Sequence, residues 1–157
     1  MKKHILILLI LTTINAFSQN NNPSVSFVNS KTLATPAGYS QAAVTDLGNS
    51  TMIILSGQVP LDKQGALVDK DNFEKQPEQV FTNIKNAVTE LGGSMDNIVK
   101  FGYFVSGINQ MQKLRPVRNK YINTKNPAAS TLIQVSKLYC DDVILEVEAT
   151  AILPKMK

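Results

Sequence analysis

The residues of this 157-residue chain that are best suited to chemistry are two glutamates near its C-terminal end. Glu146 and Glu148 stand in the otherwise apolar segment from Val143 to Leu153, and residues two apart on a strand lie on the same face of a sheet. A glutamate is rarely buried in such a strand without a partner or a function, so we predict that Glu146 is a site residue. We interpret Glu148 as the structural member of the pair.

The N-terminal segment has the pattern of a secretory signal peptide. A basic start at residues 1–4 precedes an apolar run at residues 5–11, and the small residues Ala16 and Ser18 mark a cleavage site expected after Ser18. The apolar run is short for a bilayer-spanning helix, which leaves a membrane anchor as the less favoured alternative. We therefore predict a signal peptide at residues 1–18 and export, with the bacterial periplasm as the expected compartment and secretion beyond it left open.

Composition excludes several kinds of site in the mature chain. His4 is the single histidine and lies in the predicted signal peptide, so histidine-based triads are excluded. Cys140 is the single cysteine, which excludes an intramolecular disulfide and, with histidine, a soft-ligand metal site, so we expect no metal. Loss of Lys2 and Lys3 leaves 14 basic and 12 acidic residues, and this net charge of +2 is too small to indicate nucleic acid as a partner.

The mature chain has room for one domain. We predict a flexible leader at residues 19–24 and a single domain at residues 25–157. Apolar patterns predict strands at residues 25–29, 42–47, 51–56, 98–105, 129–135 and 143–153, and helices at 74–91 and from Asn109 or from near Arg115. Pro116 disfavours helical geometry at the residue before it, so the second helix either follows a cap at Asn109 with a kinked start or begins near Arg115.

This order of elements indicates an α+β fold in which both helices cover one face of a sheet. Gly92 and Gly93 are predicted to end the first helix, and residues 47–50 to form a hairpin turn. Apolar residues also fall on the other face of the sheet. Covering that face is favourable by about 25 cal/mol per Å², so we predict an oligomer.

Four short motifs together resemble the RidA/YjgF family of enamine and imine deaminases over about residues 25–153. They are Tyr39-Ser40-Gln41, Leu55-Ser56-Gly57-Gln58-Val59-Pro60, Pro127-Ala128-Ala129-Ser130-Thr131 and Leu145-Glu146-Val147-Glu148-Ala149. The resemblance implies a chorismate-mutase-like α+β fold with a mixed sheet, assembled as a homotrimer with three ligand sites in the clefts between subunits. It also implies hydrolysis of an imine or enamine, such as a 2-iminoacid, to a ketone and ammonia, without a cofactor.

The resemblance also implies roles for individual residues. Tyr39 matches a tyrosine that borders the cleft, Ser56 and Gly57 match a strand end whose hydroxyl and backbone N–H face the ligand, and Glu146 matches the glutamate that positions the attacking water. Two alternatives stay open. Tyr39 serves equally well as a packing residue at a subunit seam, and Ser56-Gly57 as a strand-end turn.

One position departs from the family pattern. Ala129 stands beside Ser130 where the family usually carries an arginine that clamps the substrate carboxylate, and alanine supplies neither charge nor donor. Arg115 matches a position where many members carry an asparagine that faces the cleft, so a guanidinium from another wall is one compensating possibility. The alternative for Arg115 is a solvated arginine at a helix start.

These observations leave three functions to weigh. The leading candidate is an exported Rid-type protein that binds small imine, enamine or related carbonyl metabolites and hydrolyses them as a deaminase. The alternative is a noncatalytic trimer that binds a small ligand or acts as a scaffold. A third candidate, ribonuclease or translation inhibition, gains no support from the charge of +2 and the lack of histidine in the mature chain. The identity of the substrate stays open.

Overall fold

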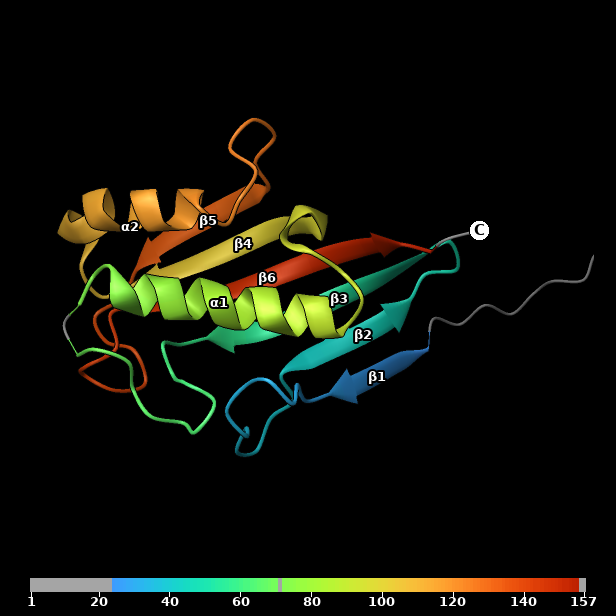
Figure 1. Ribbon diagram of the computed structural model, residues 1–157, viewed down its shortest axis with the longest axis horizontal. Coiled ribbons are helices and arrows are strands. Elements are labelled where there is room, and N and C mark those ends of the chain that lie inside the picture. The colour runs from blue at the N-terminus through green and yellow to red at the C-terminus, as the bar shows by residue number, and fades with distance from the viewer. Residues whose placement is uncertain (1–23, 71, 156–157) are drawn as a thin grey trace, which may run out of the picture.

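A computed structural model describes residues 24–70 and 72–155 of the chain. Six strands form one sheet, with helices on one side (Figure 1). The strands are β1 (Val25–Val28), β2 (Ala42–Asp46), β3 (Ser50–Gln58), β4 (Ile98–Val105), β5 (Ala129–Gln134) and β6 (Leu145–Pro154), and the α-helices are α1 (Lys75–Glu90) and α2 (Met111–Asn119). Two 3-10 turns, Met95–Asn97 and Ile108–Gln110, precede β4 and α2. The predicted signal peptide and residues 19–23 of the leader lie outside the described residues.

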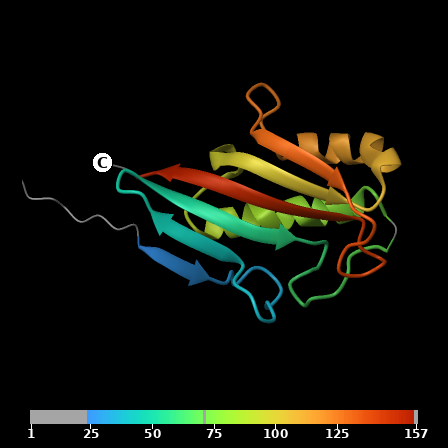
Figure 2. The ribbon, with the colours of Figure 1, turned by 180° about the vertical axis from the view of Figure 1, so that it is seen from behind.

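The sheet has the strand order β1-β2-β3-β6-β4-β5, so the last strand of the chain lies in its interior. All neighbours are antiparallel except β4 and β5, which run parallel. Both helices cover the same face, and the view from behind shows the opposite face of the sheet without a helix over it (Figure 2). The predicted α+β fold, with a mixed sheet and two helices on one face, is confirmed.

Strict alternation along β6 separates the two faces of the sheet. Leu145, Val147 and Ala149 point toward the helices and are at most 3% exposed, whereas Glu146 and Glu148 lie on the uncovered face. Residues of α1 meet this apolar row with the helical spacing that the sequence predicts, and its fully buried members are Val80, Phe81, Ile84 and Val88. Each such side chain stabilises the fold by roughly 1.5–3 kcal/mol relative to its exposed state.

An aromatic cluster joins α1 and the segment just after α2 to the sheet. Phe81 of α1 stacks on Tyr121 at a ring-centroid distance of 5.4 Å and meets Phe101 of β4 edge-on at 6.3 Å. Tyr103 also contacts this cluster, and burial raises its pKa to about 12. The cluster fixes the helix layer over β4, and therefore fixes which face of the sheet stays uncovered.

The end of α1 confirms the sequence prediction. Gly92 has a φ of +87°, and its N–H donates to Thr89 while that of Gly93 donates to Val88. This is the Schellman arrangement, in which a glycine in the left-handed region closes the last turn.

The start of α2 corrects the sequence analysis. The helix begins at Met111 and contains Pro116 in its interior, so a start near Arg115 is wrong, and so is a cap by Asn109. The 3-10 turn Ile108–Gln110 leads directly into α2, so the helix begins well before Pro116 rather than next to it. Leu114 and Val117, each 4% exposed, anchor the helix against the core and offset the hydrogen bond that Pro116 cannot donate.

Buried amide side chains hold the loops at the sheet end where β6 begins. Gln76 is fully buried, donates to the carbonyl of Asp142 at 2.8 Å and accepts from the N–H of Ile144 at 3.0 Å. Asn83 donates to the carbonyls of Val59 and Leu61 at 3.1 and 2.9 Å. The segment just after β3 and the segment just before β6 are therefore both tied to α1.

Replacing Gln76 should test how much this tie contributes. Gln76→Leu keeps the side-chain volume but leaves the N–H of Ile144 and the carbonyl of Asp142 without a partner, so we expect a loss of about 2–4 kcal/mol in the free energy of unfolding. Urea unfolding followed by circular dichroism measures it, with Gln112→Leu at an exposed position of α2 as the control. A loss below about 1 kcal/mol would contradict the structural role of the amide.

Candidate functional site

Glu146 lies on the uncovered face of the sheet, where its carboxylate covers Gly57 of the neighbouring strand. A Cβ atom at position 57 would fall 1.9 Å from Oε1 of Glu146, so only glycine leaves room for the carboxylate in this position. The register of β3 against β6 shifts between Leu55 and Gln58, which places Ser56 and Gly57 in an irregular segment beside the glutamate. The Ser56 hydroxyl donates to the carbonyl of Ser40 at 2.7 Å. The structure therefore brings together Glu146 and the Ser56-Gly57 strand end.

The environment of Glu146 disfavours its charged form. Burial raises the pKa of the Glu146 carboxyl above its ordinary value of 4.5, and the negative charge of Glu148 on the same face raises it further. Glu148 covers Gly102 of β4 in a similar way, since a Cβ there would lie 2.5 Å from its Oε1. A carboxyl with a raised pKa holds its proton to a higher pH than an exposed glutamate does, which suits it to accept and return a proton.

Tyr39 belongs to the same neighbourhood through a second tyrosine. Burial raises the pKa of Tyr139, and Cys140, the phenol of Tyr39 and the carboxylate of Glu146 raise it further. Tyr39 and Glu146 therefore both lie close enough to the Tyr139 hydroxyl to influence its pKa, although both tyrosines are largely exposed. Tyr139 and Cys140 are site neighbours that the sequence analysis missed as such. The sequence offered one sign of this, because both residues lie in the turn just before β6, the strand that carries Glu146.

Ala129 and Ser130 lie away from Glu146 within one chain. Ala129 begins β5 and pairs with Lys100 of β4. Lys100 in turn pairs with Thr150 of β6, whereas Glu146 of β6 pairs with Phe104 of β4. Two strand spacings and four residues along the strand separate Ala129 from Glu146, or about 16 Å between Cα atoms. Ser130 falls on the opposite face of β5 by alternation.

Arg115 is also apart from Glu146 in the single chain. It is exposed on α2, which lies over the face of the sheet opposite to the glutamate. Arg118, three residues later, donates to the side chain of Asn119 at 2.9 Å. A ligand role for Arg115 stays a prediction, as do the roles of the other proposed site residues.

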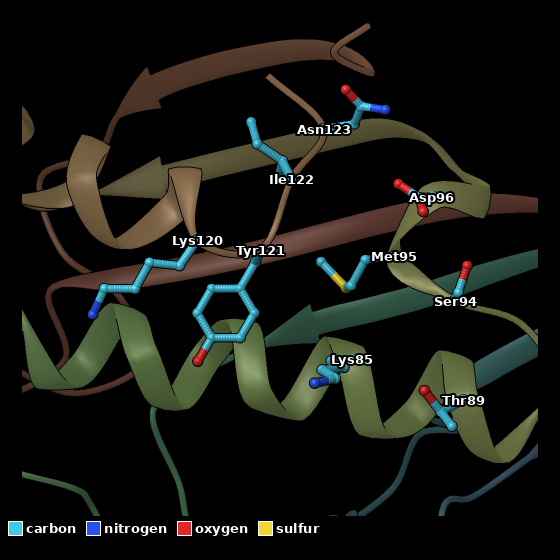
Figure 3. Close-up of a pocket in the computed structure, with 9 residues that line it drawn as sticks. All are labelled: Lys85, Thr89, Ser94, Met95, Asp96, Lys120, Tyr121, Ile122 and Asn123. Atoms are coloured by element: carbon cyan, nitrogen blue, oxygen red, sulfur yellow. The ribbon is translucent and has the colours of Figure 1, made fainter. Parts of the chain in front are cut away.

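A separate cavity of about 400 Å³ lies on the helix side of the sheet (Figure 3). Its lining comes from α1, from the turn before β4 and from the segment after α2, and comprises Lys85, Thr89, Ser94, Met95, Asp96, Lys120, Tyr121, Ile122 and Asn123. Lys120 also pairs with Glu78 at 3.4 Å. The predicted site residues lie elsewhere, so this cavity is distinct from the Glu146 site.

Within residues 24–70 and 72–155 there is no group of three histidine, cysteine, aspartate or glutamate side chains placed to hold a metal ion. The helices described there are also too short or too polar to cross a membrane.

The raised pKa of Glu146 predicts how stability should depend on pH. The native state binds the proton more tightly than the unfolded chain, so the ionised carboxylate lowers the free energy of unfolding at pH values above the native pKa. We expect Glu146→Gln to stabilise the protein at pH 7, with a gain that disappears as the pH falls through 4.5. Urea unfolding at pH 7 and pH 4 measures this, with exposed Glu74→Gln as the control. A gain that stays constant over this pH range would contradict the burial of the Glu146 carboxyl.

Comparison with known proteins gives one family. The family model described as Endoribonuclease L-PSP matches residues 14–153. A RutC family protein of Pyrococcus abyssi is 33% identical over 113 residues, which cover 72% of this chain and 84% of that protein.

Solved structures agree with this result. The YjgF gene product of E. coli superposes with a TM-score of 0.69 at 29% identity, covering 81% of this chain and 98% of that chain. E. coli TdcF, solved with bound serine, gives a TM-score of 0.67 at 25% identity, covering 80% of this chain and 96% of that chain. The chain therefore has the RidA-like fold and belongs to the Endoribonuclease L-PSP family, the RidA/YjgF (Rid) family that its motifs resemble.

Proposed function

We propose that the protein is an exported Rid-type hydrolase that converts small imines or enamines, 2-iminoacids among them, to a carbonyl compound and ammonia. The observation that carries the proposal is the carboxylate of Glu146, held against Gly57 with a raised pKa on the uncovered face of the sheet. Family membership supports a Rid-type function in general. The assignment of imine or enamine hydrolysis as the reaction rests on the chemistry that this carboxylate permits.

The reaction needs one group that takes a proton and returns it. As water attacks the carbon of a protonated imine, its oxygen forms the C–O bond, the C=N electron pair moves to nitrogen, and Glu146 accepts the proton released from the water. Glu146 then returns that proton to the nitrogen. As the C–N bond breaks, the hydroxyl gives its proton to Glu146, the O–H electron pair forms the C=O bond, and the amine nitrogen leaves as ammonia, which takes up the proton held by Glu146 and departs as ammonium. A carboxyl with a raised pKa does both steps better than a fully exposed glutamate.

We further propose a homotrimer with ligand sites between subunits. Two observations support it: Ala129 and Glu146 are about 16 Å apart in one chain, and the uncovered face carries exposed Ile54 and Ile133. A second copy packed on this face would remove apolar surface from water and bring the start of one β5 toward the Glu146 of its neighbour. The serine bound to TdcF supports a small ligand of amino-acid type.

The alternative is a noncatalytic trimer that binds a small ligand. Ala129 is the observation that favours it, because alanine lacks the bidentate donors with which arginine fixes a carboxylate. Loss of such a clamp costs roughly 30- to 1000-fold in transition-state binding.

Ammonia release from freshly generated 2-iminoacids separates the two candidates. We expect the mature protein to turn over these substrates and Glu146→Gln to lower kcat by about 10²- to 10⁴-fold, since the variant cannot take the proton. Ala129→Arg should raise kcat/KM by roughly 30- to 1000-fold. Exposed Glu74→Gln is the matched control. Equal turnover by the Glu146→Gln variant would remove the enzyme candidate, and turnover by Ala129→Arg alone would favour the noncatalytic one.

The mass of the exported protein tests assembly and processing together. We expect the native mass of three copies and an N-terminus at Gln19 in protein purified from the periplasm, because cleavage is predicted after Ser18. Native mass spectrometry and N-terminal sequencing measure both. A monomer with Met1 retained would contradict the proposed trimer and export.

A further inference from the structure

A further cavity lies on the helix side of the sheet, between the end of α1 and the edge strands β1 and β2. Its volume is about 220 Å³. Val28, Ala42 and Leu55 are paired partners on β1, β2 and β3, so they form one row across its floor. Ala87 and Leu91, four residues apart at the end of α1, line the helix wall. Because α2 lies toward the β5 edge, the loop after β1 forms the remaining wall in place of a second helix (Figure 1).

The floor and the helix wall of this cavity are apolar. Ala42, Leu55 and Ala87 are each at most 3% exposed, and Val28 and Leu91 pack against the same core. In another protein, an apolar cavity of about 150 Å³ stays free of water and binds benzene. The larger cavity of this chain therefore has room for a six-membered ring that carries a small substituent.

The polar residues of the loop wall hold one another in place. Gln41 is 4% exposed, its Nε2 donates to the carbonyl of Ala34 at 2.7 Å, and its Oε1 accepts from the N–H of Ser30 at 2.8 Å. The Oδ1 of Asn29 accepts from the N–H of Gln41 at 3.0 Å. The Nδ2 of Asn29 has no acceptor within the part of the chain that the structure describes, so this wall offers a ligand one hydrogen-bond donor.

A carboxylate stands at the opening of the cavity. Exposed Glu90 is the one charged residue among the described residues that line it. The Ser30 hydroxyl donates to this carboxylate, and the N–H of Lys31 lies 3.1 Å from both of its oxygens. These hydrogen bonds hold the pKa of the Glu90 carboxyl below its ordinary value of 4.5, so it is ionised at neutral pH. A negative charge at the opening disfavours an anionic ligand.

We infer that this cavity is a second ligand site, which takes a small uncharged ring compound of about the size of phenol with a hydrogen-bond acceptor on the ring. The apolar walls contact the ring, Asn29 donates to the acceptor, and Glu90 excludes acids. The cavity lies on the face of the sheet opposite to Glu146, and the proposed trimer packs on that other face. The inference therefore depends neither on the proposed hydrolase nor on its assembly.

NMR of the full mature protein with isotope-labelled alanine methyl groups tests the inference, because Ala42 and Ala87 both line the cavity. Phenol is the neutral probe, and benzoate is its anionic counterpart. We expect phenol to shift both methyl signals with a dissociation constant on the order of 1 mM. We expect benzoate to bind there about 10-fold more weakly or not at all, because of the charge of Glu90.

Two variants and a matched control place the probe. Ala87→Leu fills the cavity from α1, so it should weaken phenol binding by about 10-fold or more, with the Ala42 methyl as the reporter. Thr89→Leu is the control, since it adds the same side chain at an exposed position of the same helix that lines the separate cavity of about 400 Å³. Glu90→Gln removes the charge at nearly constant size, so it should leave phenol binding unchanged and strengthen benzoate binding by about 10-fold.

Several results would overturn the inference. One is phenol that moves neither methyl signal at millimolar concentration, and another is equal phenol affinity of the native protein and a folded Ala87→Leu variant. Phenol binding that is lost in Thr89→Leu would assign the probe to the separate cavity instead. If Ala87→Leu does not fold, Glu90→Gln decides, because benzoate binding that stays the same in this variant would contradict a site that excludes acids by charge.

Discussion

The rest of the structure depends on the alternation of side chains along β6. This strand lies between β3 and β4, so each of its residues either enters the core under α1 or faces away from it. Leu145, Val147 and Ala149 supply the apolar row that the helix covers, and the same alternation forces Glu146 and Glu148 onto the uncovered face. A shift of one residue in register would bury both carboxylates in the core at a cost of several kcal/mol each.

Two glycines make this carboxylate row possible. Gly57 on one side and Gly102 on the other each lie under a glutamate side chain that any Cβ atom would displace. Partial burial over glycine is also the cause of the raised pKa of Glu146, so the packing and the proposed chemistry have the same origin. The buried amide of Gln76 holds the segment just before β6, which keeps the first glutamate in place relative to the β3 end. Fold and site are therefore coupled through a few contacts at one end of the sheet.

The sequence predicts those parts of the structure that follow from local patterns. The 3.6-residue period of α1, its glycine end and the strands are confirmed, because apolar spacing and turn residues determine them directly. Of the two starts predicted for α2, the one near Arg115 was wrong, because the helix begins at Met111 and holds Pro116 in its interior. The structure places the carboxylate of Glu146 over Gly57, and the site roles of Glu146, Ser56 and Gly57 stay predictions. The row of Lys100, Ala129 and Thr150 depends on the register of three strands, and a single sequence does not specify that register. Arg115 lies on α2, over the face of the sheet opposite to Glu146, so only the proposed trimer would bring the two residues together.

The central claim is that the carboxyl of Glu146 takes and returns the proton in the reaction. The most direct test is to compare two pH titrations of the mature protein, the NMR titration of the Glu146 carboxyl carbon and the pH profile of kcat/KM for 2-iminoacid hydrolysis. We expect the carboxyl to titrate above 4.5 and the acidic limb of the activity profile to fall at the same pH. A carboxyl that titrates at or below 4.5, or an acidic limb that stays in place when Glu146 is replaced by glutamine, would contradict it.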